Sequence, residues 1–144
     1  MKKQVNWTNA LSPRGLLAKA REAAFYAYAP YSGFQVGAAL LFEDEQVLAA
    51  CNVENASIGL SICAERNVVA AMVAKGLQAP VAIAVSGSKA GELEVPCPPC
   101  GACRQVLMEF APDLLVVLGS SEDFTLHRMR DLLPLQFSLK KDGA

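Results

Sequence analysis

The chain has 144 residues, 53% of them hydrophobic, and this length and composition fit one compact domain, which we expect to span residues 1–144. The net charge is -1 and no run of lysine or arginine exceeds two, which argues against a nucleic-acid-binding protein and favours a small, weakly charged substrate. The start lacks the apolar segment of a signal peptide, and no stretch approaches the ~20 apolar residues of a membrane span, so we expect a soluble, cytoplasmic protein with no membrane partner.

The first third of the chain predicts a helix followed by a hairpin of two strands. Pro13 stands at the first turn of the helix, and Pro30 ends it. Apolar residues at helical spacing form the expected buried stripe of this helix: Leu16, Leu17, Ala20, Ala24 and Tyr28. After the turn YSGF, two apolar runs separated by the acidic EDEQ predict the hairpin: residues 36–42 and 47–53.

The remainder predicts helices that alternate with strands. A second helix begins at Cys63 and ends at Gly76, a residue type that commonly terminates helices. A third helix over residues 101–110 separates two continuous apolar runs, which are typical of strands covered on both faces: residues 81–86 and 114–119. A last strand over residues 123–127 and a short helix stopped by Pro134 follow. This order predicts an α/β fold, a three-layer α/β/α sandwich around a mixed sheet of about five strands.

Five cysteines, an odd number, suit a metal site in a reducing compartment better than a disulfide framework. Cys63, Cys100 and Cys103 supply three thiols for one zinc ion, and a catalytic zinc site keeps its fourth position for water. Cys100 and Cys103 lie three residues apart at the opening of a predicted helix, so both thiols can reach one ion. Helix N-termini also favour thiolate over thiol, because unpaired N–H groups and the macrodipole stabilise negative charge there.

A carboxylate follows the first of these thiols by two residues. Two positions in a regular helix of ~3.6 residues per turn point to nearly opposite sides, so Glu65 meets the metal only if Cys63 is the non-helical cap, which we predict. Glu65 would then act as general acid and base beside the ion. Three thiolates leave the site negative and weaken the metal as a Lewis acid, so we expect Arg66 or Arg104 to donate to a ligand sulfur.

The remaining cysteines and the histidine have simpler interpretations. Cys97 also has CxxC spacing with Cys100, but two intervening prolines favour an extended path that sets them roughly 9 Å apart, so we expect Cys97 to be a bystander. Cys51 is interpreted as a buried small hydrophobe, and His127 is assigned no role. A structural zinc module remains an alternative, and its function would be indifferent to replacement of Glu65 by Gln.

Three segments, in order and at family-like spacing, resemble the cytidine deaminase family in its short, single-domain form: AYAPYSGFQVGAAL, CNVENASIGLSICAER and PCGACRQVLMEF. The resemblance runs from about Tyr28 to Phe137 and includes the zinc-deaminase signature, with Cys63 in the place of its histidine. It implies zinc-dependent hydrolytic deamination of cytidine and 2′-deoxycytidine to uridine and 2′-deoxyuridine in pyrimidine salvage. Zinc would activate water for attack on C4 of cytosine while Glu65 shuttles protons, and ammonia would leave.

The resemblance also implies a role for individual residues. One Zn²⁺ per subunit would be bound by Cys63, Cys100 and Cys103, with Arg66 compensating the thiolate charge and Glu65 as the catalytic residue. The substrate-binding residues would be Phe34 beside the pyrimidine, Asn52 and Glu54 on the ribose hydroxyls, Val53, Ala64 beside the base, and Phe137. The short form is typically a homotetramer in which an aromatic residue near the C-terminus reaches the base in a neighbouring subunit's site, a position that Phe137 fits.

The chain departs from the family pattern at Gln35, Ile58 and Leu135–Gln136, of which Ile58 and the C-terminal residues could alter the pocket or the subunit contact. An alternative enzyme is a deaminase of another cytosine compound, such as blasticidin S, which shares the CAE and PCxxC elements. The NVENAS segment favours a nucleoside instead. A tRNA or DNA deaminase would need basic and aromatic surface for the strand, which this near-neutral chain lacks.

Overall fold

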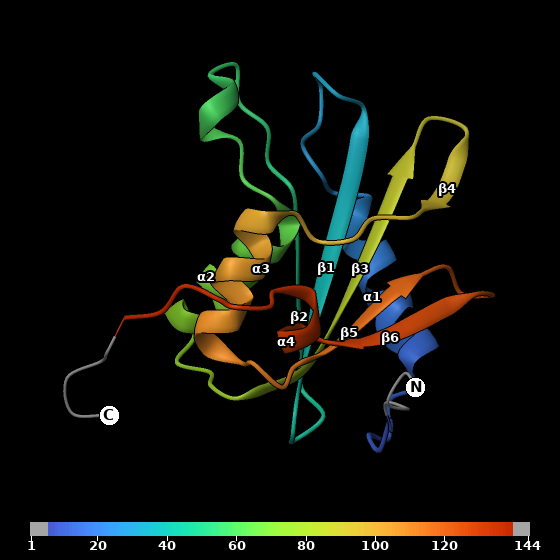
Figure 1. Ribbon diagram of the computed structural model, residues 1–144. Helices are drawn as coiled ribbons and strands as arrows, with labels where there is room; N and C mark the ends of the chain where they lie inside the picture. The colour runs from blue at the N-terminus through green and yellow to red at the C-terminus, as the bar shows by residue number, and fades with distance from the viewer. Residues whose placement is uncertain (1–5, 140–144) are drawn as a thin grey trace.

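The computed structural model describes residues 6–139, in which a mixed six-stranded sheet lies between two layers of helices (Figure 1). The strands are β1 (Phe34–Phe42), β2 (Val47–Cys51), β3 (Pro80–Lys89), β4 (Glu92–Val95), β5 (Leu115–Gly119) and β6 (Phe124–Arg128). The helices are α1 (Pro13–Ala24), the 3-10 helix η1 (Ile58–Leu60), α2 (Ala64–Ala74), α3 (Gly101–Phe110) and α4 (Met129–Leu132). Residues 1–5 and 140–144 of the expected domain lie outside the described residues.

The sheet has the order β2-β1-β3-β5-β6, and β4 pairs with β3 beyond this path. β3 and β5 run parallel, and the other neighbouring pairs are antiparallel. The predicted three-layer α/β class is confirmed, with one strand more than expected. The additional strand is β4, a short segment in which acidic and apolar residues alternate. It has no continuous apolar run of the kind that predicted the other strands.

One layer is α1, which packs on the face of β1, β3 and β5. Ser12 caps this helix by accepting a hydrogen bond from Gly15 N at 3.0 Å, and the predicted stripe is buried over its first four members. Gly37 of β1 lies directly beneath this helix, and a Cβ built on it would be only 1.7 Å from the carbonyl oxygen of Ala20. The missing side chain lets the helix backbone approach the strand.

The prediction that this first helix reaches Pro30 is wrong, because α1 ends at Ala24. Tyr28 N donates to Asn52 O at 3.1 Å, and Glu54 N donates to Tyr28 O at 2.8 Å. These bonds hold the chain after α1 in an extended path beside residues 52–54, and the Tyr28 side chain is exposed and not part of the buried stripe. The segment that approaches β1 therefore lies next to the segment that leaves β2.

The opposite face of the sheet carries the larger core, covered by α2, α3 and α4. Apolar side chains from both layers meet there, among them Leu40, Val68, Met72, Ile83, Leu107 and Val116. Helix α3 has the predicted bounds, and Gly76 with φ 69° ends the turn after α2, as its position predicted. Within the described residues, no helix combines the length and the apolar character needed to cross a membrane.

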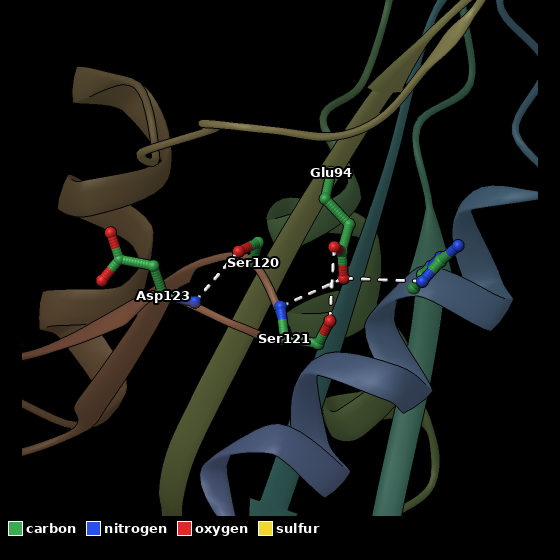
Figure 2. A network of polar contacts seen from close by, with 5 residues as sticks. Glu94, Ser120, Ser121 and Asp123 are labelled. Carbon is green, nitrogen blue, oxygen red and sulfur yellow. Dashed lines mark hydrogen bonds and ion pairs between the residues drawn. The ribbon is translucent and has the colours of Figure 1, made fainter.

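The added strand β4 is fastened by a polar network around Glu94, whose backbone φ is 75° (Figure 2). Its carboxylate accepts hydrogen bonds from Ser121 N at 3.1 Å and Ser121 Oγ at 3.3 Å, and it pairs with Arg21 of α1 at 3.5 Å. Asp123 N donates to Ser120 Oγ at 3.1 Å within the same turn. The hairpin of β3 and β4 is thereby joined to the β5–β6 turn and to α1.

Candidate metal centre and substrate pocket

Three thiols meet where α2 and α3 begin. Cys63 is the N-cap of α2 and Cys100 the N-cap of α3, both with extended backbone, while Cys103 lies in the first turn of α3. The Sγ atoms of Cys63 and Cys100 are 4.0 Å apart, those of Cys100 and Cys103 are 3.5 Å apart, and all three lie within 4.8 Å of one another. Ligands about 2.3 Å from one tetrahedral centre are about 3.8 Å apart, so the spacing suits zinc. The predicted non-helical position of Cys63 is confirmed.

The two thiols of α3 differ in how readily they ionise. Burial disfavours the Cys100 thiolate, but hydrogen bonds from the backbone and thiol of Cys103 outweigh it and hold the pKa of Cys100 below its ordinary value. Burial, together with the nearby Glu65 carboxylate, raises the pKa of Cys103. The expected lowering of a thiol pKa at a helix end is therefore found for Cys100 at the cap, whereas at Cys103, within the first turn, burial and Glu65 outweigh it. A divalent cation would offset this crowding of acidic groups, so the donor set fits a metal.

Glu65 is a buried acidic side chain next to the three thiols. Its side chain is 3% exposed and stands in the first turn of α2. Burial raises the pKa of Glu65, while a hydrogen bond from the Cys103 thiol works in the opposite direction. A carboxyl group with a raised pKa beside a metal site can both accept and donate a proton near neutral pH.

The two candidate arginines take different positions. Arg66 Nη2 lies 4.0 Å from Cys63 Sγ and donates to Ser61 O at 3.3 Å, and the contact with Cys63 is the main reason why the pKa of Arg66 is raised. Arg104 instead donates to Pro99 O and to Leu132 O, both at 2.8 Å, and so fixes the approach to α3 against the end of α4. Arg66 is thus the arginine that the structure places against a ligand sulfur.

A cavity of about 320 Å³ opens onto Cys63, Glu65 and Cys100. Its other lining residues are Ser32, Phe34, Val36, Asn52, Glu54, Ala64, Cys97 and Pro98. Four of the expected substrate-binding residues are therefore brought together with the thiols: Phe34, Asn52, Glu54 and Ala64. Larger hollows of about 440 and 460 Å³ lie elsewhere on the surface, but their lining residues include neither a cysteine nor Glu65.

Two expected substrate-binding residues are not among those that line this cavity. Val53 pairs with Ile62 through the backbone, with Val53 N donating to Ile62 O at 3.0 Å, and its side chain is 46% exposed. Phe137 is 69% exposed beside α3, where its carbonyl oxygen accepts a hydrogen bond from Gln105 Nε2 at 3.0 Å. Its ring is accessible to another molecule and lies apart from the pocket of its own chain.

The amide of Asn52 extends the pairing between β2 and β1 beyond the end of β2. Its Oδ1 accepts a hydrogen bond from Val36 N at 2.8 Å, and its Nδ2 donates to Phe34 O at 2.9 Å. An asparagine amide has two donor hydrogens and two acceptor lone pairs, so one of each remains for a ligand. The backbone of β1 therefore sets the orientation of this side chain at the cavity wall.

The carboxylate of Glu54 is held by the turn that precedes β1. Its Oε1 accepts hydrogen bonds from Tyr31 N at 3.0 Å and Ser32 N at 3.1 Å, and its Oε2 accepts one from Ser32 Oγ at 2.6 Å. The Ser32 hydroxyl is the main cause of a Glu54 pKa below the ordinary value. An ionised carboxylate only accepts hydrogen bonds, so it would receive a donated hydroxyl hydrogen from a ligand.

Some residues in or beside the cavity were given no role by the sequence analysis: Ser32 and Cys97 line it, and Gly87 lies against two of its lining residues. Ser32 appeared there only as part of a turn, and nothing in the sequence marks Gly87, where a Cβ would lie 2.9 Å from both Phe34 Cζ and Cys97 Cβ. Cys97 lies outside the thiol cluster, as predicted, but it lines the cavity, and burial raises its pKa to about 12. The CPPC spacing drew attention to Cys97 without indicating that its side chain forms a wall.

Cys51 and His127, which have no proposed role, are not among the residues that line the cavity. Cys51 is half-buried and not fully buried as expected, and its carbonyl oxygen accepts a hydrogen bond from Asn67 Nδ2 at 2.9 Å. His127 stands on β6, with its Nε2 2.8 Å from Thr125 Oγ1.

Comparison with known proteins places this site in context. Residues 12–119 match the family model described as "Cytidine and deoxycytidylate deaminase zinc-binding region". A cytidine deaminase of Halalkalibacterium halodurans is 45% identical over 125 residues, which cover 85% of this chain and 92% of that protein. The crystal structure of a cytidine deaminase from Burkholderia pseudomallei is 47% identical and has a TM-score of 0.76, covering 85% of this chain and 96% of that one. A blasticidin-S deaminase of Bacillus cereus is 27% identical over 72% of this chain and 76% of that protein.

These matches identify the metal of the site as zinc. The family model is that of a zinc-binding region, and the three thiols lie inside its matched residues at a spacing that suits zinc. The prediction of zinc as the cofactor is confirmed.

Proposed function

Because the chain belongs to the family of cytidine and deoxycytidylate deaminases, we propose that it deaminates cytidine and 2′-deoxycytidine hydrolytically, with zinc as its cofactor. The products are uridine or 2′-deoxyuridine and ammonia, and the general role is pyrimidine salvage. The observation that carries this proposal is the buried Glu65 carboxyl at the end of a cavity, beside three convergent thiols.

Cys63, Cys100 and Cys103 hold the metal, and the bound ion supplies Lewis acidity that lowers the pKa of water toward neutrality. Arg66 offsets part of the negative charge of the three thiolates through its contact with Cys63. This compensation limits the loss of Lewis acidity that three anionic ligands would cause.

Glu65 moves the protons of the reaction. It accepts one from the attacking water and donates it to N3 of the base, while a C4–O bond forms. It then carries the proton of the new C4 hydroxyl to the amino group, so that the C4–N bond breaks and ammonia leaves. The raised pKa that burial gives Glu65 suits a group that must bind and release a proton in each turnover.

The remaining cavity residues bind the nucleoside. Phe34 stacks on the pyrimidine, the backbone beside Ala64 orients the base, and Asn52 and Glu54 receive the sugar hydroxyls. The spare donor and acceptor of Asn52 and the acceptor-only Glu54 suit hydroxyl groups, each of which donates one hydrogen bond and accepts others. Val53 contributes through its backbone, which is fixed by its pairing with Ile62.

The protein is further proposed to be a cytoplasmic homotetramer with one zinc ion per subunit, in which Phe137 reaches the site of a neighbouring subunit. The exposed position of Phe137, apart from its own cavity, supports this assignment. Exposed apolar side chains also gather on two segments that lie side by side: Phe25, Tyr26, Tyr28 and Tyr31, and Val53, Ile58, Leu60 and Ile62. The loop that carries η1 stands away from the rest of the chain, where a second subunit can cover it (Figure 1).

The test is ammonia release from cytidine, 2′-deoxycytidine, cytosine and blasticidin S by zinc-loaded protein, with Glu65→Gln in parallel. We expect release from the two nucleosides, and a kcat lower by about 10²–10⁴-fold in Glu65→Gln at unchanged zinc content, because the proton carrier is lost. Glu122→Gln, which alters an exposed carboxylate of the β5–β6 turn, is the matched control and retains full activity.

The other outcomes separate the alternatives. Release from blasticidin S alone would replace the nucleoside by another cytosine compound. No release from any compound by zinc-loaded protein would favour a structural zinc module. A Glu65→Gln variant that releases ammonia as fast as the parent would remove Glu65 from the proposed mechanism.

A further inference from the structure

One hydroxyl group joins the proposed sugar-binding carboxylate to the start of β1. Ser32 Oγ donates to Glu54 Oε2 at 2.6 Å and accepts a hydrogen bond from Phe34 N at 2.9 Å. Ser32 also lines the cavity, as do both of its partners. Ser32 therefore touches two groups that the proposed function assigns to opposite parts of the nucleoside, the sugar and the base.

The turn that carries Ser32 is closed by its own backbone. Gly33 has φ 67°, a conformation that suits glycine, and Gly33 N donates to Ala29 O at 3.0 Å. This turn brings Phe34 N back to the hydroxyl of the residue two positions earlier. The position of Ser32 Oγ is thus set by the backbone on both sides of Gly33.

The hydroxyl has a single proton, and that proton is committed. A serine can donate one hydrogen bond, and the short contact with an ionised carboxylate is of the stronger, charge-assisted kind. Ser32 has no second proton to donate to a substrate. Its geometry is therefore that of a group that holds Glu54 in place.

Glu54 has little acceptor capacity left beyond these bonds. An ionised carboxylate offers about four acceptor positions, and the turn fills three of them with hydrogen bonds from Tyr31 N, Ser32 N and Ser32 Oγ. About one position remains for a hydroxyl donated by the substrate. The direction of that remaining position is fixed by the three bonds already made.

We propose that Ser32 is a positioning residue that anchors Glu54 to the start of β1 and thereby sets how strongly the enzyme prefers nucleosides that carry sugar hydroxyls. The inference rests on the proposed function of Glu54 and Phe34. Phe34 keeps two other anchors, its pairing with Lys89 of β3 and the bond from Asn52 Nδ2 to its carbonyl oxygen. Loss of the Ser32 hydroxyl should therefore displace the Glu54 carboxylate more than the Phe34 ring.

The experiment compares Ser32→Ala and Ser32→Thr on cytidine and on 2′,3′-dideoxycytidine, which lacks both secondary hydroxyls. We expect Ser32→Ala to lower kcat/KM for cytidine by roughly 10–100-fold, mainly through KM, because a hydrogen bond to a charged group is lost. The value for the dideoxy compound changes by less than about 3-fold, and Ser32→Thr recovers most of the cytidine activity because it keeps the hydroxyl. Ser120→Ala is the control, since it also removes a hydroxyl that accepts a backbone N–H, outside the cavity.

A double variant tests the route of the effect. In a Glu54→Gln background, Ser32→Ala should change the ratio of the two kcat/KM values by less than about 3-fold, because the group that Ser32 positions is already altered. An equal loss on both substrates in the single variant, or an undiminished effect of Ser32→Ala in the Glu54→Gln background, overturns the inference and leaves the proposed function intact. A parent protein that deaminates neither nucleoside overturns the proposed function, and this inference with it.

Discussion

Arg66 places a positive charge against a cluster that is otherwise acidic. It stands one residue after Glu65 and touches Cys63, so a single helical turn carries both the proposed proton carrier and a positive charge beside a thiol of the metal site. Because partners of a metal ligand stabilise its deprotonated form, we expect Arg66→Gln to weaken zinc binding by about 10–100-fold. Competition with a chromophoric chelator measures this change.

Lys75→Gln is the matched control for that experiment. It removes the same charge from an exposed position at the other end of α2, so zinc affinity should stay at the parent value. Equal weakening in both variants would show that net charge is responsible, and the contact with Cys63 would then have no specific effect.

At the scale of residues, the sequence predicted contacts that depend on near neighbours. The cap position of Cys63 followed from helical geometry, because Glu65 could reach the metal in no other way. The choice between Arg66 and Arg104 stayed open, since it depends on where α4 ends. Ser32 and Gly87 were missed for a related reason: the atoms that they contact belong to other segments of the chain, and the sequence alone does not show those contacts.

Among the elements, the contact of α1 with β1 depends on a residue that has no side chain. A Cβ at position 37 would lie 1.7 Å from Ala20 O and 2.7 Å from Ala24 N, both backbone atoms that cannot rotate away. Gly37→Ala therefore forces α1 off the sheet. We expect the free energy of unfolding to fall by about 3 kcal/mol, at the upper end for overpacking, as measured by urea titration.

Gly59→Ala provides the comparison, because a Cβ at this position meets nothing within 4 Å. Its unfolding midpoint should match that of the parent protein. A Gly37→Ala variant as stable as Gly59→Ala would mean that the helix can shift without loss of packing.

Helices and strands were predictable where one pattern of apolar residues, either helical spacing or a continuous run, extends over the whole segment. Helix α3 was placed with its observed bounds, and the neighbouring parallel strands β3 and β5 were recognised from their apolar runs. The end of α1 was misplaced because Tyr28 pairs with the segment that follows β2, a contact that helical spacing cannot reveal. Strand β4 was missed because it owes its position to the contacts of Glu94 with Ser121 and Arg21.

In the whole molecule, the proposed sharing of sites between subunits makes a prediction about mixtures. Glu65→Gln supplies an intact Phe137 to its neighbours, and Phe137→Ala supplies an intact Glu65. If Phe137 completes the neighbouring site, two weakly active variants co-expressed with different tags should form mixed oligomers that regain activity. Ammonia release by doubly affinity-purified oligomers measures the recovery.

Each variant purified alone gives the baseline for that experiment. Mixed oligomers that stay at the baseline would place Phe137 outside the neighbouring site. The sequence suggested this assembly through resemblance alone. Its physical basis, the grouping of apolar side chains from two segments more than twenty residues apart, becomes visible only in the folded chain.

The position of the thiols in the chain also determines when all three ligands have been synthesised. Cys63 precedes β3, whereas Cys100 and Cys103 follow it, so a nascent chain that ends before residue 100 offers one of the three ligands. In the folded chain β3 lies between β1 and β5, and the caps of α2 and α3 meet at the thiol cluster. A chain that stops before Cys100 lacks two of the three ligands, and because metal binding is coupled to folding, we expect it to bind zinc more weakly than the full chain.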